Sequence, residues 1–288
     1  MKVSVVIPTY NRAKDLSVLL DCILKQTTLP LEIIIVDDNT PDNSINDVFN
    51  SYKLQFGKLD CDLKYARNVR ENSASISRNV GLRLASGEVF MFFDDDMFLF
   101  DDYIEKIIDV FKIHPEALGV QGWIQSSGIS NKRQNLPFMI LHKIFLLGQA
   151  TRDSCNLFSY PAILTKIINC QALCGGAMAL RKEVFKEFLF DENLKKHSHM
   201  EDDLFSYSVY QKYPDSLFIT PYAKCIHKHS SAGRVVGKQT DRTKNAYRRY
   251  VLVKLFGKKG NILYFWQRTG LVLEANIITI GKKIKNRT

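Results

Sequence analysis

Short apolar runs alternate with longer helical patterns along the first third of the chain. The spacing of apolar residues predicts helices over Arg12–Gln26, Asn43–Phe56 and Ala74–Ala85. Four intervening runs predict short strands, and most of these runs are rich in Val, Ile or Phe: Val3–Pro8, Leu31–Asp38, Leu63–Arg67 and Glu88–Asp96. Continuous apolar strands are covered on both faces, so the sequence predicts an α/β fold with a parallel sheet of βαβ units.

The second half of the chain is less regular. It contains a helical pattern over Glu201–Lys212 and two short strand patterns at Leu217–Ile219 and Ala223–Ile226. Neither an internal repeat nor a linker-like segment interrupts residues 1–233. We therefore expect one domain over residues 1–233, followed by an extension over residues 234–288.

Polar residues follow three of the predicted strands at the point where each strand ends. In open α/β sheets, ligands bind at the carboxyl ends of the strands, where such residues come together. We expect three groups to meet at this edge of the sheet: Pro8, Thr9, Tyr10 and Asn11; Asp37, Asp38 and Asn39; and Asp94, Asp95 and Asp96. This convergence indicates a ligand-binding site.

The acidic triplet Asp94–Asp96 is the clearest candidate for chemistry. Three adjacent carboxylates repel one another unless a cation neutralises them. Irregularly spaced oxygen ligands suit Mg²⁺ or Mn²⁺ held jointly with a diphosphate, rather than zinc. The alternative is a solvated acidic turn before a helix that starts near Asp101, but the apolar run Val89–Phe93 places the triplet at a strand end and favours a functional role.

Three further groups have both a functional and a structural interpretation. Asp38 could accept hydrogen bonds from a nucleotide base or a ribose, or it could belong to a turn that caps the next helix. The acidic run Glu201–Asp203 opens a predicted helix, where acidic residues favour the helix dipole, but Asp202 is also the natural base for an incoming hydroxyl group. His227 could complete a metal shell begun by Asp96, or it could be structural.

The net charge of +10 is concentrated near the C-terminus. Residues 234–288 contain 14 Lys and Arg against 2 Asp and Glu, which leaves 26 against 28 for residues 1–233. Basic residues interleaved with aromatic ones suit an anionic membrane surface, and no nucleic-acid-binding motif accompanies them. The other interpretation is a helical appendage that packs on the body or on a partner chain, and the oligomeric state stays open. Polar residues interrupt the longest apolar stretch, Leu263–Ile280, so we expect no spanning helix.

Motifs that are absent narrow the function further. The chain has no GxGxxG, GxxxxGK[ST] or GxSxG sequence, which excludes the common dinucleotide-binding, P-loop and hydrolase patterns. A DxD-type phosphotransferase or phosphatase is one alternative function, although Phe98 stands where that pattern has Thr or Val. The six cysteines lack a CxxC pair and the N-terminus lacks a signal-peptide pattern, so we expect reduced thiols and a cytoplasmic location.

The order of these segments resembles the inverting family 2 glycosyltransferases of the GT-A fold over Val3–Ser231. VSVVIPTYNR is similar to the family's first strand and nucleotide loop, and LEIIIVDDNT is similar to its second strand. ENSASISRNVGLRLASGEVFMFFDDD resembles the helix that leads into the DXD strand, and CGGAMALRKEVFKEFLFDENL resembles the segment before an E-D pair, here Glu201-Asp202. Ser73, the pair Gly175-Gly176 and the run FLFDE depart from the family's usual residues but leave the carboxylates unchanged.

The resemblance implies a mostly parallel, Rossmann-like sheet flanked by helices, with a nucleotide-binding half over residues 1–97 and an acceptor-binding half over residues 98–233. It also implies a set of donor contacts: Pro8, Thr9, Tyr10, Asn11 and Asp38 at the nucleoside, Arg78 near the base or phosphate, and Asp94, Asp95 and Asp96 around the ribose, sugar-phosphate and metal. Gly175, Gly176 and Glu201 would lie on the acceptor side. Asp96 and His227 would ligate Mn²⁺ or Mg²⁺, and Asp202 would be the catalytic base.

The implied reaction is an inverting transfer from a nucleotide-diphosphate sugar to a glycan or lipid-linked glycan, in cell-surface polysaccharide synthesis. A UDP-sugar is the default donor because Asp38 matches the residue that contacts uracil. With a lipid-linked acceptor, residues 234–288 would contact the inner face of the cell membrane. A non-catalytic nucleotide-sugar or glycan binder of the same fold is the remaining alternative. The donor sugar, the acceptor and the linkage depend on irregular loops between Gly122 and Gly176 and are not predicted.

Overall fold

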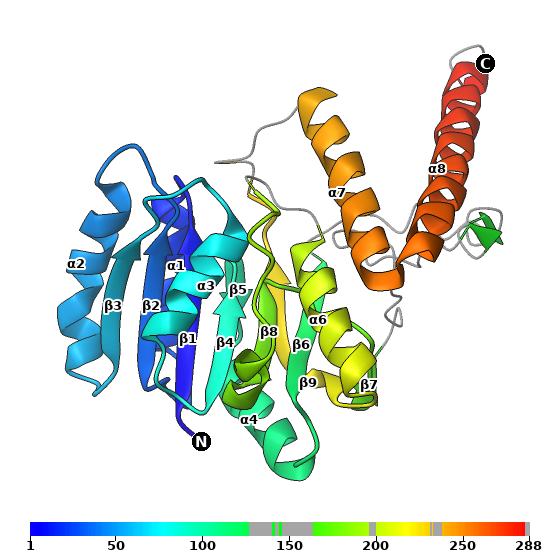
Figure 1. Ribbon diagram of the computed structural model, residues 1–288. Helices are drawn as coiled ribbons and strands as arrows, with labels where there is room; N and C mark the ends of the chain where they lie inside the picture. Colours follow the sequence, from blue (N-terminus) through cyan, green and yellow to red (C-terminus); the bar gives the residue numbers. More distant parts are fainter. Residues whose placement is uncertain are drawn as a thin grey trace.

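The computed structural model describes residues 1–126, 140–141, 144–145, 164–195, 200–230, 232 and 238–285. The strands in this part of the chain are β1 (Val3–Thr9), β2 (Glu32–Asp37), β3 (Asp62–Arg67), β4 (Val89–Phe93), β5 (Met97–Leu99), β6 (Gly119–Ser126), β7 (Ile168–Asn169), β8 (Ala177–Arg181) and β9 (Leu217–His227). These nine strands form one sheet in the order β3-β2-β1-β4-β8-β6-β9-β5, with β7 paired to β9 (Figure 1).

The N-terminal half of the sheet is parallel, as the apolar runs predict. β1 lies between β2 and β4, β3 lies beside β2, and all three pairs are parallel. The helices α1 (Ala13–Leu24), α2 (Ser44–Gly57) and α3 (Ala74–Leu84) connect these strands and match the predicted helices to within three residues. The predicted strand over Glu88–Asp96 ends earlier, at Phe93, so the three aspartates lie in the turn between β4 and β5.

The other half of the sheet is mixed. β8 runs antiparallel between β4 and β6, β5 and β7 are antiparallel to β9, and β6 is parallel to β9. The two short strands predicted between Leu217 and Ile226 are one strand, β9, with a register shift opposite Gly122 and Trp123. Pro221 lies at this irregularity and cannot donate a backbone hydrogen bond, which explains why the sequence pattern breaks there.

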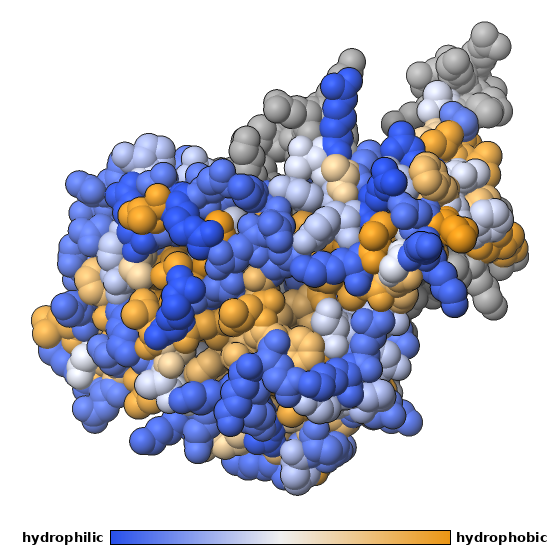
Figure 2. Space-filling model, in the orientation of Figure 1, coloured by the Kyte–Doolittle hydropathy of each residue, from blue (hydrophilic) through white to orange (hydrophobic). Residues whose placement is uncertain are grey.

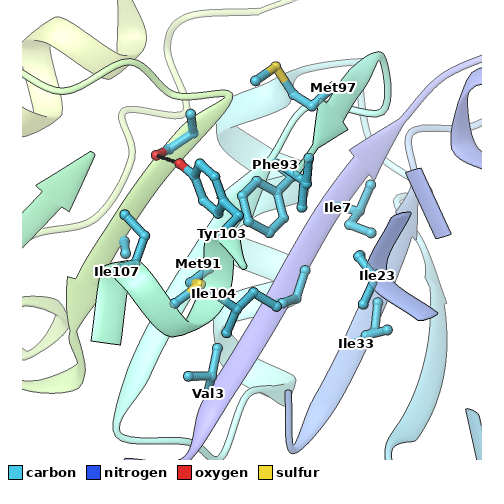
Figure 3. Packing of buried hydrophobic residues seen from close by; sticks show 14 of the residues in the cluster. Val3, Ile7, Ile23, Ile33, Met91, Phe93, Met97, Tyr103, Ile104 and Ile107 are labelled. Atoms are coloured by element: carbon cyan, nitrogen blue, oxygen red, sulfur yellow. Dashed lines mark hydrogen bonds between the residues drawn. The ribbon is translucent and has the colours of Figure 1, made fainter. Parts of the chain in front are cut away.

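Alternating side chains of the strands form a core on each face of the sheet. One core contains residues of α1, α2 and α4 (Tyr103–Ile113), and the other contains residues of α3, the 3₁₀ helix η1 (Lys182–Lys186) and α6 (Glu201–Lys212). Tyr103 is fully buried in the first core, with its ring edge-on to Phe93 and its hydroxyl donating to Ala177 O at 3.0 Å (Figure 3). In the second, a Cβ at Gly81 would lie 2.3 Å from Val6, so only glycine lets α3 approach β1 this closely.

The C-terminal extension forms two helices, α7 (Lys238–Phe256) and α8 (Lys258–Lys285), which meet at Gly257 with a φ of +58°. Val251 and Leu255 of α7 pack on Leu204 of α6 and on Leu194. α8 extends away from the sheet (Figure 1). Among the described residues, none of the helices combines the length and the apolar character that a membrane crossing requires.

Candidate active site

The three polar groups at the strand ends lie close together, as the strand-end rule predicts. Thr9 at the end of β1 donates from Oγ1 to Asp95 Oδ2 at 2.8 Å. The backbone N–H of Asn11 donates to Thr40 Oγ1, which follows β2, at 3.0 Å. Asn11 and Asn39 both have left-handed backbone conformations, with φ of 54° and 66°, so the chain turns sharply after β1 and after β2.

Asp38 is held in place by three polar side chains. Asn68 Nδ2 and Ser77 Oγ donate to its Oδ1 at 2.6 and 2.8 Å, and Asn72 Nδ2 donates to its backbone oxygen at 2.5 Å. Among the described residues, both hydrogen bonds to the carboxylate end on Oδ1, so Oδ2 remains available to a ligand. This arrangement favours the binding role of Asp38 over a simple turn or helix cap.

Asp95 is buried and paired with Arg12. Arg12 Nη1 donates to Asp95 Oδ1 at 2.8 Å, and the same guanidinium donates to the backbone oxygens of Ser230 and Ala232. Burial raises the pKa of Asp95 to about 7, against the opposing effect of Arg12. Arg12 therefore connects the first strand-end loop with the segment after β9, a contact that the sequence interpretation did not include.

Asp96 is buried beside His227, the last residue of β9. His227 Nε2 lies 3.0 Å from Asp96 Oδ1, and Ser230 N–H donates to Asp96 Oδ2 at 2.9 Å. Burial alone would raise the pKa of Asp96, but the contacts with His227, Arg12 and Ser230 outweigh it and lower this pKa to about 2. The rings of His227 and His229 lie 3.9 Å apart, so both histidines face this part of the site.

Asp94, Asp96 and His227 could hold one metal ion. Each offers one ligand atom, and these atoms lie within 4.8 Å of one another. Two carboxylate oxygens and an imidazole nitrogen form a donor set that fits a divalent ion with open positions for a diphosphate, and it suits Mn²⁺ better than Mg²⁺ because of the imidazole. The geometry adds Asp94 to the two predicted ligands, Asp96 and His227.

Arg78 lies between Asp94 and the start of α6. Its side chain is 2% exposed, with Nη2 3.0 Å from Asp94 Oδ1 and Nη1 2.9 Å from Glu201 Oε1. The guanidinium also lies over the ring of Phe190 at 5.4 Å. Arg78 and Glu201 thus form a buried pair between the triplet and α6, and Glu201 is mostly covered rather than open to an acceptor.

Asp202 lies on the other side of this pair, at the first turn of α6. The residue before α6, Met200, is left-handed with a φ of 69°. Gly175 N–H donates to Asp202 Oδ2 at 2.9 Å, and Asp203 N–H donates to Oδ1 at 3.0 Å. Burial raises the pKa of Asp202, partly offset by Gly175 and Arg78. The residue as a whole is half-buried, which leaves part of it accessible to a bound hydroxyl group.

The pair Gly175-Gly176 separates the triplet from Asp202. A Cβ at Gly176 would lie 2.8 Å from Asp94 Oδ2, and a Cβ at Gly175 would lie 2.9 Å from Arg78 Nη2 and 3.0 Å from Asp202 Cβ. Neither position has room for a side chain without movement of a charged neighbour. These glycines therefore lie between Asp94 and Asp202, and their predicted place on the acceptor side stays a prediction.

Sequence reasoning missed several residues of this site, among them Arg12, Asn68 and Ser77. Arg12 directly follows the polar group that ends at Asn11, and Ser77 precedes the predicted Arg78, so proximity along the chain was the available signal. Asn68 follows β3 at the same edge of the sheet and could have been included by the strand-end rule. Most of the region between Gly122 and Gly176 that was expected to set specificity lies outside the described residues.

Comparisons with known proteins identify the family. Residues 4–189 match the glycosyl transferase family 2 domain. The chain is 32% identical over 235 residues to the glucosyl-dolichyl phosphate glucuronosyltransferase of Haloferax volcanii, covering 79% of this chain and 69% of that protein. It is 33% identical over 178 residues to the undecaprenyl-phosphate 4-deoxy-4-formamido-L-arabinose transferase of Serratia proteamaculans, covering 59% of this chain and 52% of that protein.

Solved structures share the fold at lower identity. The fold matches residues 1–349 of S. aureus TarS in complex with UDP-GlcNAc with a TM-score of 0.58 at 18% identity, covering 89% of this chain and 67% of that one. It matches GalNAc-T7 with UDP, GalNAc and Mn²⁺ with a TM-score of 0.62 at 17% identity, covering 88% of this chain and 48% of that one. The phosphatase alternative has no support in these matches. The chain belongs to glycosyl transferase family 2, has the GT-A fold and is a glycosyltransferase.

Proposed function

We propose that this chain is a metal-dependent, inverting glycosyltransferase that moves a sugar from a UDP-sugar to a hydroxyl group of a lipid-linked glycan. The observation that carries the proposal is the position of Arg78, with the carboxylates of Asp94 and Glu201 at 3.0 and 2.9 Å. A candidate metal centre and a candidate base, Asp202, therefore flank one buried arginine. We assign the reaction to residues 1–233, with residues 1–97 binding the nucleotide.

The donor side of the proposal uses the residues at the strand ends. Asp38 Oδ2 would accept from the uracil ring, while Asn68 and Ser77 hold the carboxylate by its other oxygen. The likeness in fold to a protein solved with UDP-GlcNAc supports a uridine nucleotide. Pro8, Thr9, Tyr10 and Asn11 would line the nucleoside, since they follow β1 at the same edge.

Asp94, Asp96 and His227 would hold the divalent ion. When bound, the ion would stabilise the negative charge on the departing diphosphate as a Lewis acid. Mn²⁺ in a solved structure of similar fold supports this choice of metal. Arg12 would hold Asp95 and the segment after β9 in place, which fixes His227 and Ser230 around Asp96.

Asp202 would take the proton of the acceptor hydroxyl during a single in-line displacement, which inverts the anomeric carbon. Its raised pKa makes it a stronger base than an ordinary aspartate, and the N–H groups of Gly175 and Asp203 fix its orientation. The lipid phosphates in the names of two relatives support a lipid-linked acceptor. A role in cell-surface polysaccharide synthesis at the inner face of the membrane follows from such an acceptor.

Substitution of Asp202 by Asn tests the base. We expect turnover to fall by about 10²–10⁴-fold, the usual contribution of a general base. The affinity for UDP in the presence of Mn²⁺, measured by calorimetry, should stay nearly unchanged. Asp47→Asn is the matched control, because Asp47 also lies in the first turn of a helix, α2, but is exposed and remote from the site. Full activity of the Asp202→Asn variant would refute the assignment.

Substitution of Asp96 by Ala tests the metal centre. Loss of one ligand should weaken Mn²⁺-dependent binding of UDP by at least about ten-fold, since even residues outside the ligand set change metal affinity by 10–100-fold. Chelation by EDTA should stop turnover, and added Mn²⁺ should restore it. Metal-independent turnover of the wild type would remove the ion from the mechanism and leave the Asp202 test unaffected.

A further inference from the structure

Helix α8 carries a row of exposed apolar side chains, here called its apolar face. Six large apolar side chains on this helix are between 41% and 72% exposed: Ile262, Phe265, Trp266, Val272, Leu273 and Ile277. At 100° per residue they fall within an arc of about 140°, and Ile262 to Ile277 covers about 22 Å of helix. Figure 2 shows hydrophobic surface over this helix, at the end of the molecule away from the sheet.

The opposite face of α8 is turned toward the protein. Tyr264, Gln267 and Glu274 are buried on it, and Glu274 is the one acidic residue of the helix. Gly270 contacts Phe145, since a Cβ there would lie 2.4 Å from Phe145 Cβ. Trp266, at the edge of the apolar face, also contacts this segment: its ring lies 4.8 Å from that of Phe145, and its Nε1–H donates to Ile144 O at 2.9 Å. The other five exposed apolar side chains are additional to these packing contacts.

A groove of about 950 Å³ between α7 and α8 adjoins the apolar face and is basic. Arg242, Arg249 and Arg268 line it, and Phe265 belongs to both the groove and the apolar face. Arg249 donates to Asn261 Oδ1 and Arg268 donates to Tyr264 OH; both partners are neutral, so neither of these contacts within the described part of the chain offsets the positive charge. Anionic headgroups would fit beside the apolar face at this groove.

We propose that the apolar face of α8 inserts into the surface of an anionic phospholipid bilayer, with the arginines of the α7–α8 groove against the lipid phosphates. The charge of the C-terminal extension favours a bilayer over a second copy of the chain as the partner of this face. Residues 234–288 carry 14 basic and 2 acidic residues, so two copies would repel each other, whereas an anionic surface attracts them. The face also has Trp and Phe, which favour the interface between lipid and water.

Sedimentation with vesicles tests the proposal and needs neither donor nor acceptor, so its outcome is independent of the proposed reaction. The full chain should bind vesicles that contain phosphatidylglycerol and bind phosphatidylcholine vesicles much more weakly. The variant Ile262→Ser, Leu273→Ser, Ile277→Ser should bind the anionic vesicles about 100-fold more weakly. This value assumes that each of the three side chains becomes about half-buried in the bilayer and contributes about five-fold to binding. The matched control is Leu54→Ser, Leu59→Ser, Ile113→Ser, three exposed apolar residues of the body that should leave binding unchanged.

The variant Arg242→Ala, Arg249→Ala, Arg268→Ala separates the electrostatic contribution. It should lose about 100-fold on anionic vesicles, since each basic residue near such a surface contributes about five-fold. Trp266 reports insertion directly: in a Trp123→Phe background it is the one tryptophan left, and its emission should shift to the blue on binding. Equal vesicle binding by the serine variant and the wild type would overturn the proposal. So would a stable dimer in solution that the serine substitutions dissociate.

Discussion

Replacement of Arg78 by Met removes the positive charge from the centre of the site and keeps most of the side-chain volume. Arg78 is 2% exposed and contacts two carboxylates, Asp94 at 3.0 Å and Glu201 at 2.9 Å. Glu201 is 8% exposed, so without Arg78 its charge is buried without its partner. Removal of one partner from a buried ion pair costs about 3–5 kcal/mol. We expect a loss of about 4 kcal/mol in the free energy of unfolding near pH 8.

The loss should shrink on acidification. Burial raises the pKa of Glu201 above its ordinary value near 4.5, and Arg78 opposes that rise. Without Arg78 the folded-state pKa is higher still, so between pH 4.5 and that pKa the folded variant binds more protons than the unfolded chain. Its stability therefore increases as the pH falls, and the difference from wild type should narrow by about 1–2 kcal/mol near pH 5.5.

Urea unfolding followed by circular dichroism, at both pH values, measures this effect. Arg83→Met is the control, because Arg83 lies on the same helix and is exposed, and we expect it to cost less than about 0.5 kcal/mol. The double variant Arg78→Met, Glu201→Gln should recover about 2 kcal/mol of the loss, since it removes the buried charge as well. A loss below about 1 kcal/mol, or one that is equal at both pH values, would refute the reasoning.

Two further predictions concern buried residues beside the site and in the sheet. Hydrogen bonds from Lys64, Ser4 and Ser86 outweigh the burial of Glu32 and lower its pKa from 4.5 to about 2. Its contribution is therefore complete above pH 4.5 and falls as the pH approaches 2, so Glu32→Gln should cost about 2–3 kcal/mol in urea unfolding at pH 7 and less than about 1 kcal/mol near pH 2.5; an undiminished difference in acid would contradict this. Gly176→Ala should displace Asp94 and weaken Mn²⁺-dependent UDP binding about ten-fold by calorimetry, whereas Gly57→Ala, with no atom within 4 Å of the added Cβ, should bind as wild type.

The sequence predicts the N-terminal half of the fold well because its strands are locally distinct. β1 and β2 are continuous apolar runs, and the parallel pairs β1–β2 and β2–β3 join strands that follow each other directly along the chain. β6 and β8 are less distinct: each pairs with strands far along the chain, Gly119, Gln121 and Gly122 interrupt the apolar pattern of β6, and β8 is a run of five residues. The positions of β6 and β8 in the sheet depend on pairing with distant strands, which the periodicity of apolar residues does not reveal.

The candidate site, like the fold, could be predicted from the sequence only in part. The strand-end rule brings Thr9, Asp38 and the triplet to one edge, but it says nothing of which carboxylate faces a ligand. In the fold Asp95 points to Thr9 and Arg12, whereas Asp94 and Asp96 lie with His227. Asp95 and Asp96 are adjacent in sequence but differ in their partners, Thr9, Arg12 and His227, which lie 83 or more residues away along the chain.

The contacts of Arg78 explain why the two halves of the site can keep a fixed geometry although they arise from distant segments. Asp94 belongs to the turn after β4, and Glu201 and Asp202 belong to α6, which precedes the C-terminal helices. One buried guanidinium contacts both segments, and the adjacent Gly175-Gly176 pair lets Asp94, Arg78 and Asp202 approach without side chains between them. Because a planar guanidinium fixes the direction of each hydrogen bond, a shift of α6 relative to β4 would break at least one of them. The distance between the candidate metal ligand Asp94 and the candidate base Asp202 is thereby set by a buried arginine rather than by the loops outside the sheet.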